Sequence, residues 1–164
     1  MKKIAVFAGI LIWCAGLVAG QNPPVAGPTA APQSSPDYSG MYTFLREGEF
    51  VQITVEDLGH VTGFVSRYGD IESDKGVFLD HFFKDGKLDG NKLTFTTNTV
   101  HGVWFDFKGA FDRGEGKNPG DEAYYILKGT LTESTTDANK KTQAKTTQVA
   151  LKSFPQDMGA PPQK

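Results

Sequence analysis

Two histidines and one aspartate are the residues whose chemistry first suggests a binding site. His81 follows Asp80 in one apolar stretch, and His101 opens another further along the chain. An imidazole can donate or accept a hydrogen bond near neutral pH, and a pair of them among aromatic side chains suits a small ligand. If the residues between the two histidines form a strand that pairs with both histidine-bearing stretches, both imidazole rings point toward the interior of the sheet. The predicted ligand-binding residues are His81, His101, Phe95, Phe105 and Tyr125.

The same residues allow an alternative, a hydrolase or isomerase in which His81 works with Asp80 or Asp106 as acid and base. No catalytic residue is assigned, because the sequence holds no Gly-x-Ser-x-Gly or His-Glu-x-x-His motif. No metal is predicted, since two separated histidines lack a third ligand motif. The acidic stretch 70–81 has Lys75 where a calcium loop needs glycine, and it ends on a histidine. No cofactor is expected.

The elements that must position these residues are strands. Residues 37–157 show apolar and polar side chains in alternation, interrupted by Gly, Asp and Asn, and no convincing helical period. The alternation predicts eight strands, at 40–45, 50–56, 61–68, 77–84, 92–97, 101–111, 122–132 and 146–154. Short connections favour antiparallel neighbours in sequence order.

A meander of eight strands removes its exposed edges by closing into an up-and-down barrel, and this is the predicted all-β fold. The alternative is a two-sheet β-sandwich, which buries the same pattern. Matching apolar and charged pairs predicts that Phe95 faces Val103. A register in which Phe83 faces Leu93 would turn His81 inward, and it is mildly favoured because a slip by one residue would bury Asp80 without a partner. Pairing Phe95 with Val103 places Trp104 on the outer face, where we expect it to be a surface contact.

The first predicted strand opens with Gly40-Met41-Tyr42. This triplet is similar to the Gly-x-Trp opening of lipocalins and avidins, with tyrosine in place of tryptophan. The resemblance implies an eight-stranded barrel, and those families bind small molecules inside it. It is used for the architecture only, because one fold supports many functions.

Both ends of the chain are expected to lie outside the barrel. Lys2 and Lys3 precede an apolar run that ends in small residues at Gly20, which is typical of a secretory signal peptide spanning 1–20. The alternatives are an uncleaved anchor and a lipid attached at Cys14, which Trp13 disfavours. A Pro-rich linker, 21–36, and a tail, 158–164, complete the predicted organisation around a domain at 37–157. The protein is thus expected to be secreted or periplasmic.

Composition excludes several classes of function. The net charge is −2, and cleavage after Gly20 would remove two lysines and make it −4, so a nucleic-acid partner is not expected. The single Cys excludes an internal disulfide. The predicted function is a binding module for a small apolar ligand or an envelope or extracellular partner. The alternatives are a structural or interaction protein with a filled core and the barrel enzyme described above.

Overall fold

The computed structural model describes residues 36–70, 72 and 74–156 of the 164-residue chain. The predicted signal peptide, the linker up to residue 35 and the predicted tail lie outside the described residues, so these assignments stay predictions. Within the described part of the chain, no helix is long and apolar enough to cross a membrane. Pro36 begins the compact unit that contains all of the described strands.

The described residues form eight β-strands and one short 3-10 turn, η1 (Asp57–Gly59). The strands are β1 (Gly40–Thr43), β2 (Phe50–Val55), β3 (Val61–Tyr68), β4 (Phe78–Asp89), β5 (Lys92–Thr97), β6 (Val103–Arg113), β7 (Tyr125–Thr136) and β8 (Thr142–Lys152). All eight predicted strands are present, and 61–68 and 92–97 have the predicted bounds. The expectation of an all-β meander is therefore confirmed.

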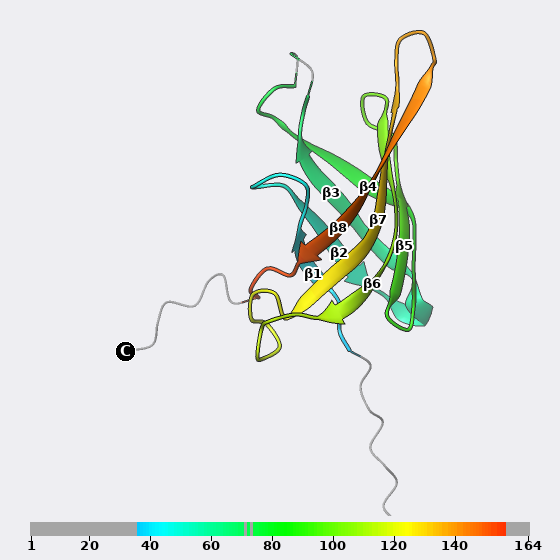
Figure 1. The fold of residues 1–164 in the computed structure, drawn as a ribbon. Coiled ribbons are helices and arrows are strands. Elements are labelled where there is room, and N and C mark those ends of the chain that lie inside the picture. The colour runs from blue at the N-terminus through cyan, green and yellow to red at the C-terminus, as the bar shows by residue number, and fades with distance from the viewer. Residues whose placement is uncertain (1–35, 71, 73, 157–164) are drawn as a thin grey trace, which may run out of the picture. The chain divides into compact units, whose positions relative to one another are not determined.

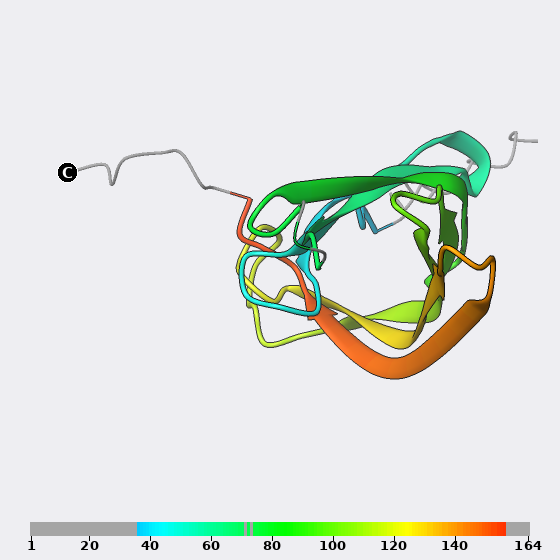
Figure 2. The same cartoon turned by 90° about the horizontal axis from the view of Figure 1, so that it is seen from above.

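Each strand pairs antiparallel with the next one in sequence, in the order β1 to β8 (Figure 1). The strands curve around a common interior when the unit is seen from above (Figure 2). A bridge between Tyr42 and Ser153 joins β1 to the end of β8, and the Phe154 amide donates to the Met41 carbonyl at 2.8 Å. The fold is an up-and-down barrel, as predicted, whose first and last strands meet at one end.

Inward-facing apolar side chains pack the interior because a strand sends alternate residues to opposite faces. Val51, Ile53, Val65, Leu93 and Leu127 are completely buried. Aromatic rings add to this core through stacking. Phe95 lies between the rings of Phe83 and Phe107, with centroids 4.3 and 5.2 Å away. At the closed end Tyr38 stacks on Phe111 at 4.3 Å.

The last hairpin is longer than predicted. Residues 133–145, expected to be a loop, instead continue β7 and begin β8, with the turn at 137–141. Thr132, Thr136, Thr142 and Thr146 pair across it, and their hydroxyls meet at 3.2 and 2.9 Å. Threonine favours strands, and cross-strand hydroxyl pairs stabilise them, so the polar composition did not indicate a loop here.

The predicted pairing registers are wrong, although most of the side chains predicted to face inward do so. Phe95 lies opposite Phe107, not Val103, because Val100 and Val103 close a separate turn through reciprocal 2.9 Å hydrogen bonds. Phe83 lies opposite Thr97, not Leu93, because β4 continues to Asp89 and turns only at residues 90–91, where the prediction had a turn over 85–90. A bulge after Phe83 changes the register by one further residue. The first shift is an even number of residues, so the same side chains still face the interior.

Candidate functional site

A pocket of about 320 Å³ opens at the end of the barrel away from the Tyr42–Ser153 bridge. The β1–β2 turn, the end of β3, and strands β6, β7 and β8 contribute to its wall. The lining residues are Leu45, Arg46, Glu49, Arg67, Asp70, Phe105, Leu131, Glu133, Lys145 and Thr147. We call this the mouth pocket. Its size is at the lower end of the range for small-molecule sites, and its wall is part apolar and part charged.

Arg67 is the most buried basic side chain of the mouth pocket. It follows Val61, Gly63 and Val65 on the inward face of β3, and its side chain is only 5% exposed. Its Nη1 atom donates to the Tyr68 carbonyl at 3.2 Å and to the Asp70 carboxylate, while its Nε atom donates to His81. Its Nη2 atom has no hydrogen-bond partner among the described residues, which leaves the two N–H groups of this atom for a ligand.

A carboxylate network holds the pocket rim. Glu49, whose side chain is 1% exposed, accepts hydrogen bonds from the Arg46 Nε atom at 2.8 Å and the Tyr68 amide at 3.1 Å. Asp70 joins both arginines, with its Oδ1 atom 3.1 Å from Arg46 Nη1 and its Oδ2 atom bonded to Arg67. Each buried charge thus has an opposite partner, as burial in a low-dielectric interior requires.

His81 lies behind Arg67, fully buried, with its ring edge-on to Phe105 at 5.2 Å. Arg67 Nε donates to His81 Nε2 at 3.2 Å, and a guanidinium can only donate, so the imidazole is neutral with its proton on Nδ1. Burial, followed by the Arg67 charge, lowers the pKa of His81 to about 4. The Nδ1 atom has no partner at hydrogen-bond geometry in the described part of the chain, and the nearby backbone groups of Asn98 and Val103 only partly offset the lowering of the pKa. His81 therefore orients Arg67 and does not reach the mouth pocket itself.

His101 does not point inward, contrary to the prediction. It lies in the β5–β6 turn with a φ of 47°, and its side chain is 52% exposed. Its Nδ1 atom is 2.5 Å from the Asp74 carboxylate, which belongs to the β3–β4 connection. The turn closed by Val100 and Val103, which changes the β5–β6 register, also places His101 outside the barrel. The expected pair of inward imidazoles is therefore not formed.

The three aromatic residues predicted for the site are separated. Phe105 lines the mouth pocket, within 5.7 Å of the Arg67 guanidinium. Phe95 lies in the central ring stack described above. Tyr125 is at the closed end, where its ring meets Tyr38 at 4.8 Å, and burial raises its pKa. Of the predicted residues, the structure brings only His81 and Phe105 together.

The carboxylates of the enzyme alternative point away from His81. Asp80 faces outward and accepts a 2.7 Å hydrogen bond from Ser66, while Asp106 accepts one of 2.7 Å from Thr96. Trp104 lies opposite Ser134 on the outer face, as predicted, and is partly exposed. No histidine–carboxylate pair faces the mouth pocket among the described residues. The described residues also contain no group of His, Cys, Asp and Glu able to hold a metal ion.

Residue patterns alone missed the arginines and Glu49. A signal for Arg67 was present, because it occupies an inward position in the alternation of 61–68, where an unpaired charge is costly. No signal identified Glu49, whose burial depends on the β1–β2 turn folding back toward Tyr68. Sequence reasoning was drawn instead to the histidines.

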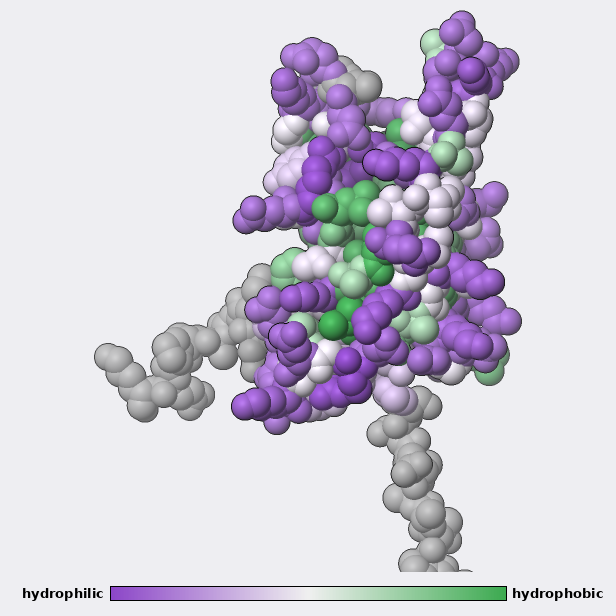
Figure 3. Space-filling model, viewed as in Figure 1, coloured by the Kyte–Doolittle hydropathy of each residue, from purple (hydrophilic) through white to green (hydrophobic). Residues whose placement is uncertain are grey.

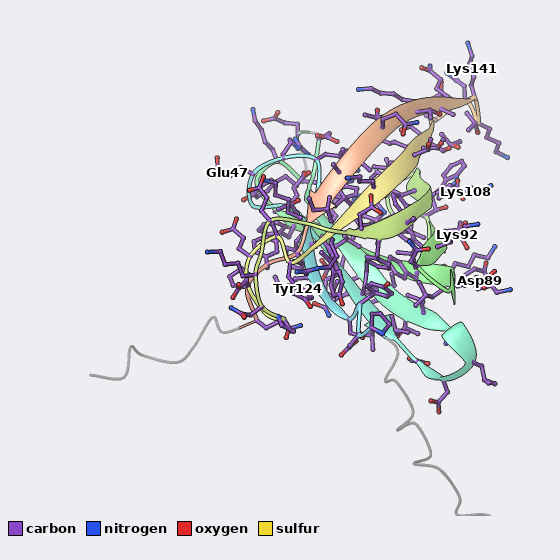
Figure 4. All side chains as sticks on the ribbon, turned by 60° about the horizontal axis from the view of Figure 1, so that its bottom comes forward. Glu47, Asp89, Lys92, Lys108, Tyr124 and Lys141 are labelled. Atoms are coloured by element: carbon purple, nitrogen blue, oxygen red, sulfur yellow. The ribbon has the colours of Figure 1, made fainter. Side chains whose placement is uncertain are left out.

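A second hollow lies on the outer face and has a different character. It measures about 590 Å³ and is shallow, with polar walls from β4 to β7 that include Thr94, Thr96, Thr130 and Thr132. Lys108 projects from this side, as do Lys92 and Asp89 nearby (Figure 4). The apolar surface visible in Figure 3 lies in the middle of another face, bordered by hydrophilic atoms. None of the polar side chains that line the outer hollow is buried, so it offers no fixed charged or hydrogen-bonding group to a ligand.

Comparisons with known proteins place the fold. No protein-family model matches the chain, and no curated protein matches it. Among solved structures, a rhizavidin–biotin complex aligns with a TM-score of 0.52 at 11% identity, over 76% of this chain and 98% of that one. A second rhizavidin structure aligns with a TM-score of 0.51 at 12% identity, over 76% and 88%. The chain thus has the fold of the avidin-like barrels, and identity this low shows the fold alone.

Proposed function

We propose that the protein binds a small molecule in the mouth pocket. The observation that carries the proposal is the Arg67 guanidinium, buried and held by His81 and Asp70, with one donor atom left over at the pocket wall. A polar group fixed in advance lowers the ordering cost of binding. One of the avidin-like neighbours was solved with biotin, which supports the use of this fold for a small ligand.

The proposed ligand has two parts. An oxygen acceptor, such as a carboxylate, would receive the hydrogen bond from Arg67 Nη2, because charge-assisted bonds of this kind are strong. An apolar part would lie against Leu45, Leu131 and Phe105, which form the uncharged wall. Glu133 of β7 and Lys145 of β8 lie opposite each other, and both line the pocket. The pocket is therefore suited to a molecule of mixed polarity more than to a purely apolar one.

Export to the periplasm or beyond is part of the proposal and rests on the 1–20 pattern alone. The envelope or extracellular partner stays a prediction. A check on export is N-terminal sequencing of the protein recovered from its own host, which should begin at Gln21. Native mass spectrometry of the same sample should detect a co-purified small molecule.

Fluorescence titration with anilinonaphthalene sulfonate tests the binding site, because this probe combines apolar rings with one anionic group. We expect saturable binding that the Thr147→Trp variant weakens at least tenfold, since Thr147 lines the pocket and the larger ring would fill it. Thr54→Trp is the matched control, because Thr54 is exposed on the outer face of β2 and lines neither hollow.

The probe could also bind exposed aromatic side chains, so a second control is needed. Phe82 is 56% exposed on the outer face of β4, and Phe82→Ser should leave the titration unchanged. Equal affinity in the Thr147→Trp and Thr54→Trp variants would contradict the proposed site, and so would a loss of binding in Phe82→Ser alone.

A further inference from the structure

Among residues 36–70, 72 and 74–156, one edge of the barrel has no partner strand over most of its length. β1 has only four residues, and it meets β8 through the single bridge Tyr42–Ser153. β8 begins eleven residues earlier, at Thr142, and is exposed from there to Gln148. The Lys152 amide donates to Thr43 Oγ1 at 2.9 Å, and this is the last contact of the β8 backbone with β1 in the direction of the mouth. The rest of β8 is an open sheet edge.

The hydrogen bonds between β7 and β8 show which backbone groups of β8 point toward β7 and which point toward the open edge. Ser153 and the other odd-numbered residues of β8 exchange hydrogen bonds with β7, as the 2.9 Å bond from the Ser153 amide to the Tyr125 carbonyl shows. The β7–β8 register continues without a bulge, so the pattern alternates along the whole strand. The amides and carbonyls that face outward along the edge are those of Thr142, Ala144, Thr146, Gln148 and Ala150.

The side chains on this edge do not prevent another strand from pairing with it. Natural edge strands are usually blunted by charged residues, proline or bulges, because unpaired backbone groups recruit another strand. From Thr142 to Ala150 the outward side chains are small or uncharged. The one charge in this stretch, Lys145, is on the inner face opposite Glu133. Lys141, at the tip of the hairpin, projects well away from the barrel (Figure 4).

We propose that the open edge of β8 pairs antiparallel with β8 of a second copy of this chain, in a two-fold dimer centred on Thr146. Backbone hydrogen bonds between sheet edges are a recurrent source of affinity in strand addition. In a two-fold contact the same surface must complement itself. β8 meets this condition, because every outward-facing amide and carbonyl from Thr142 to Ala150 then meets one from the second copy.

Charge disfavours one neighbouring register. Centring the pair on Thr146 places Ala144 opposite Gln148 of the second copy, and Lys145 opposite Thr147 of the second copy. Centring it one residue earlier would oppose the two Lys145 side chains, and like charges directly opposite are destabilising. Because Thr147 lines the mouth pocket, the amine of Lys145 from the second copy lies at the rim of that pocket. The dimer therefore adds a cationic group beside each proposed ligand site.

Light scattering coupled to size-exclusion chromatography tests the dimer on the full chain. We expect a concentration-dependent dimer, and Ala144→Pro should weaken it roughly tenfold or more, since it removes one edge amide from each copy. Proline is tolerated on sheet edges, and the β7 ladder uses the odd-numbered residues, so the fold should persist. Ala144→Ser keeps the amide and is the matched control.

Thr146→Lys is a second disrupting variant that leaves the backbone intact, since it places two like charges at the two-fold axis. Circular dichroism and thermal unfolding of each variant show whether the barrel is folded. A monomer at all concentrations, or a dimer unaffected by both Ala144→Pro and Thr146→Lys, would overturn the proposal.

Disulfide cross-linking tests the register. In a Cys14→Ser background, Thr146→Cys should form an intermolecular disulfide under mild oxidation, because residues paired on a two-fold axis lie within the Cα separation that a disulfide spans. Thr142→Cys should not, because Thr142 faces Ala150 of the second copy. Cross-linking at Thr142 and not at Thr146 would mean a different pairing. These readouts need no ligand, so their failure leaves the proposed binding function separately testable.

Discussion

At the scale of single residues, the neutral His81 is the feature that the geometry defines most sharply. A buried imidazole that accepts from a guanidinium cannot also carry a proton on Nε2. Its low pKa is thus a consequence of its place between Phe105 and Arg67. Since His81 holds the Nε atom of Arg67, protonation would disturb the residue that we propose as the ligand anchor.

His81 should make stability depend on pH. Its pKa is about 4 in the fold and near 6.5 when unfolded, so the unfolded chain binds the extra proton first. This contribution to the free energy of unfolding is complete above pH 6.5 and is lost as the pH falls toward 4, by up to about 3 kcal/mol. Urea unfolding at pH 7 and pH 4.5 measures it.

The variant His81→Gln should reduce the difference in unfolding free energy between the two pH values, because glutamine does not titrate. His60→Gln is the control, since His60 is 59% exposed in a surface pair with Glu56. An unchanged pH dependence in His81→Gln would show that the pKa of His81 does not differ between the folded and unfolded states.

At the scale of elements, the sequence predicted where the strands lie but not which residues pair across them. Alternation along 61–68 and 92–97 reports which face is buried, because that property is local to one strand. Register depends on the turn that joins two strands and on bulges. The five-residue connection 98–102 moved β6 by four positions relative to the prediction and carried His101 outside. Long Thr-rich strands were misread because hydroxyl pairs stabilise a sheet without burying apolar surface.

A pair of glycines shows how closely β6 and β7 pack against the ring of Phe107. Gly109 in β6 lies opposite Gly129 in β7, and the ring of Phe107 covers both of them. A Cβ at Gly109 would lie 2.4 Å from the Phe107 ring and 2.2 Å from the Lys128 carbonyl oxygen. These contacts leave no room for a methyl group unless the ring or the strands move.

Gly109→Ala should therefore lower the free energy of unfolding by about 2 kcal/mol or more, as overpacking does in a filled core. Thermal or urea unfolding measures the change. Ala110→Ser, at the next position, should cost less than about 0.5 kcal/mol. Comparable losses in the two variants would mean that the sheet relaxes around the added carbon.

At the scale of the whole molecule, an aromatic cluster closes the barrel. Phe111 of β6 stacks on Tyr38 and contacts Tyr42, whose hydroxyl donates to the Tyr38 carbonyl at 2.8 Å. These contacts attach the segment before β1 to β6, at the same end of the barrel as the Tyr42–Ser153 bridge. The cluster compensates for a β1 that is too short to pair along β8.

Phe111→Ala should cost about 3–5 kcal/mol of unfolding free energy, the range for removing a buried aromatic ring. Amide exchange at Phe154, which donates to Met41 across the closure, should accelerate more than the exchange of β6–β7 amides. Phe82→Ala is the control, because Phe82 is mostly exposed, and its cost should be below about 1 kcal/mol. If Phe111→Ala accelerates all amides equally, the closure does not open separately.

The amino-acid sequence by itself determined the all-β class, the number of strands, their order and the inward face of most of them. These properties follow from alternation and short connections, which act over a few residues. Only the tertiary structure decided which polar groups share the interior, because Arg67, Glu49 and His81 meet through registers and turns that long-range packing sets. It also left one edge of β8 unpaired by any described residue over most of its length, because β1 is much shorter than β8 and the two meet only when the barrel closes.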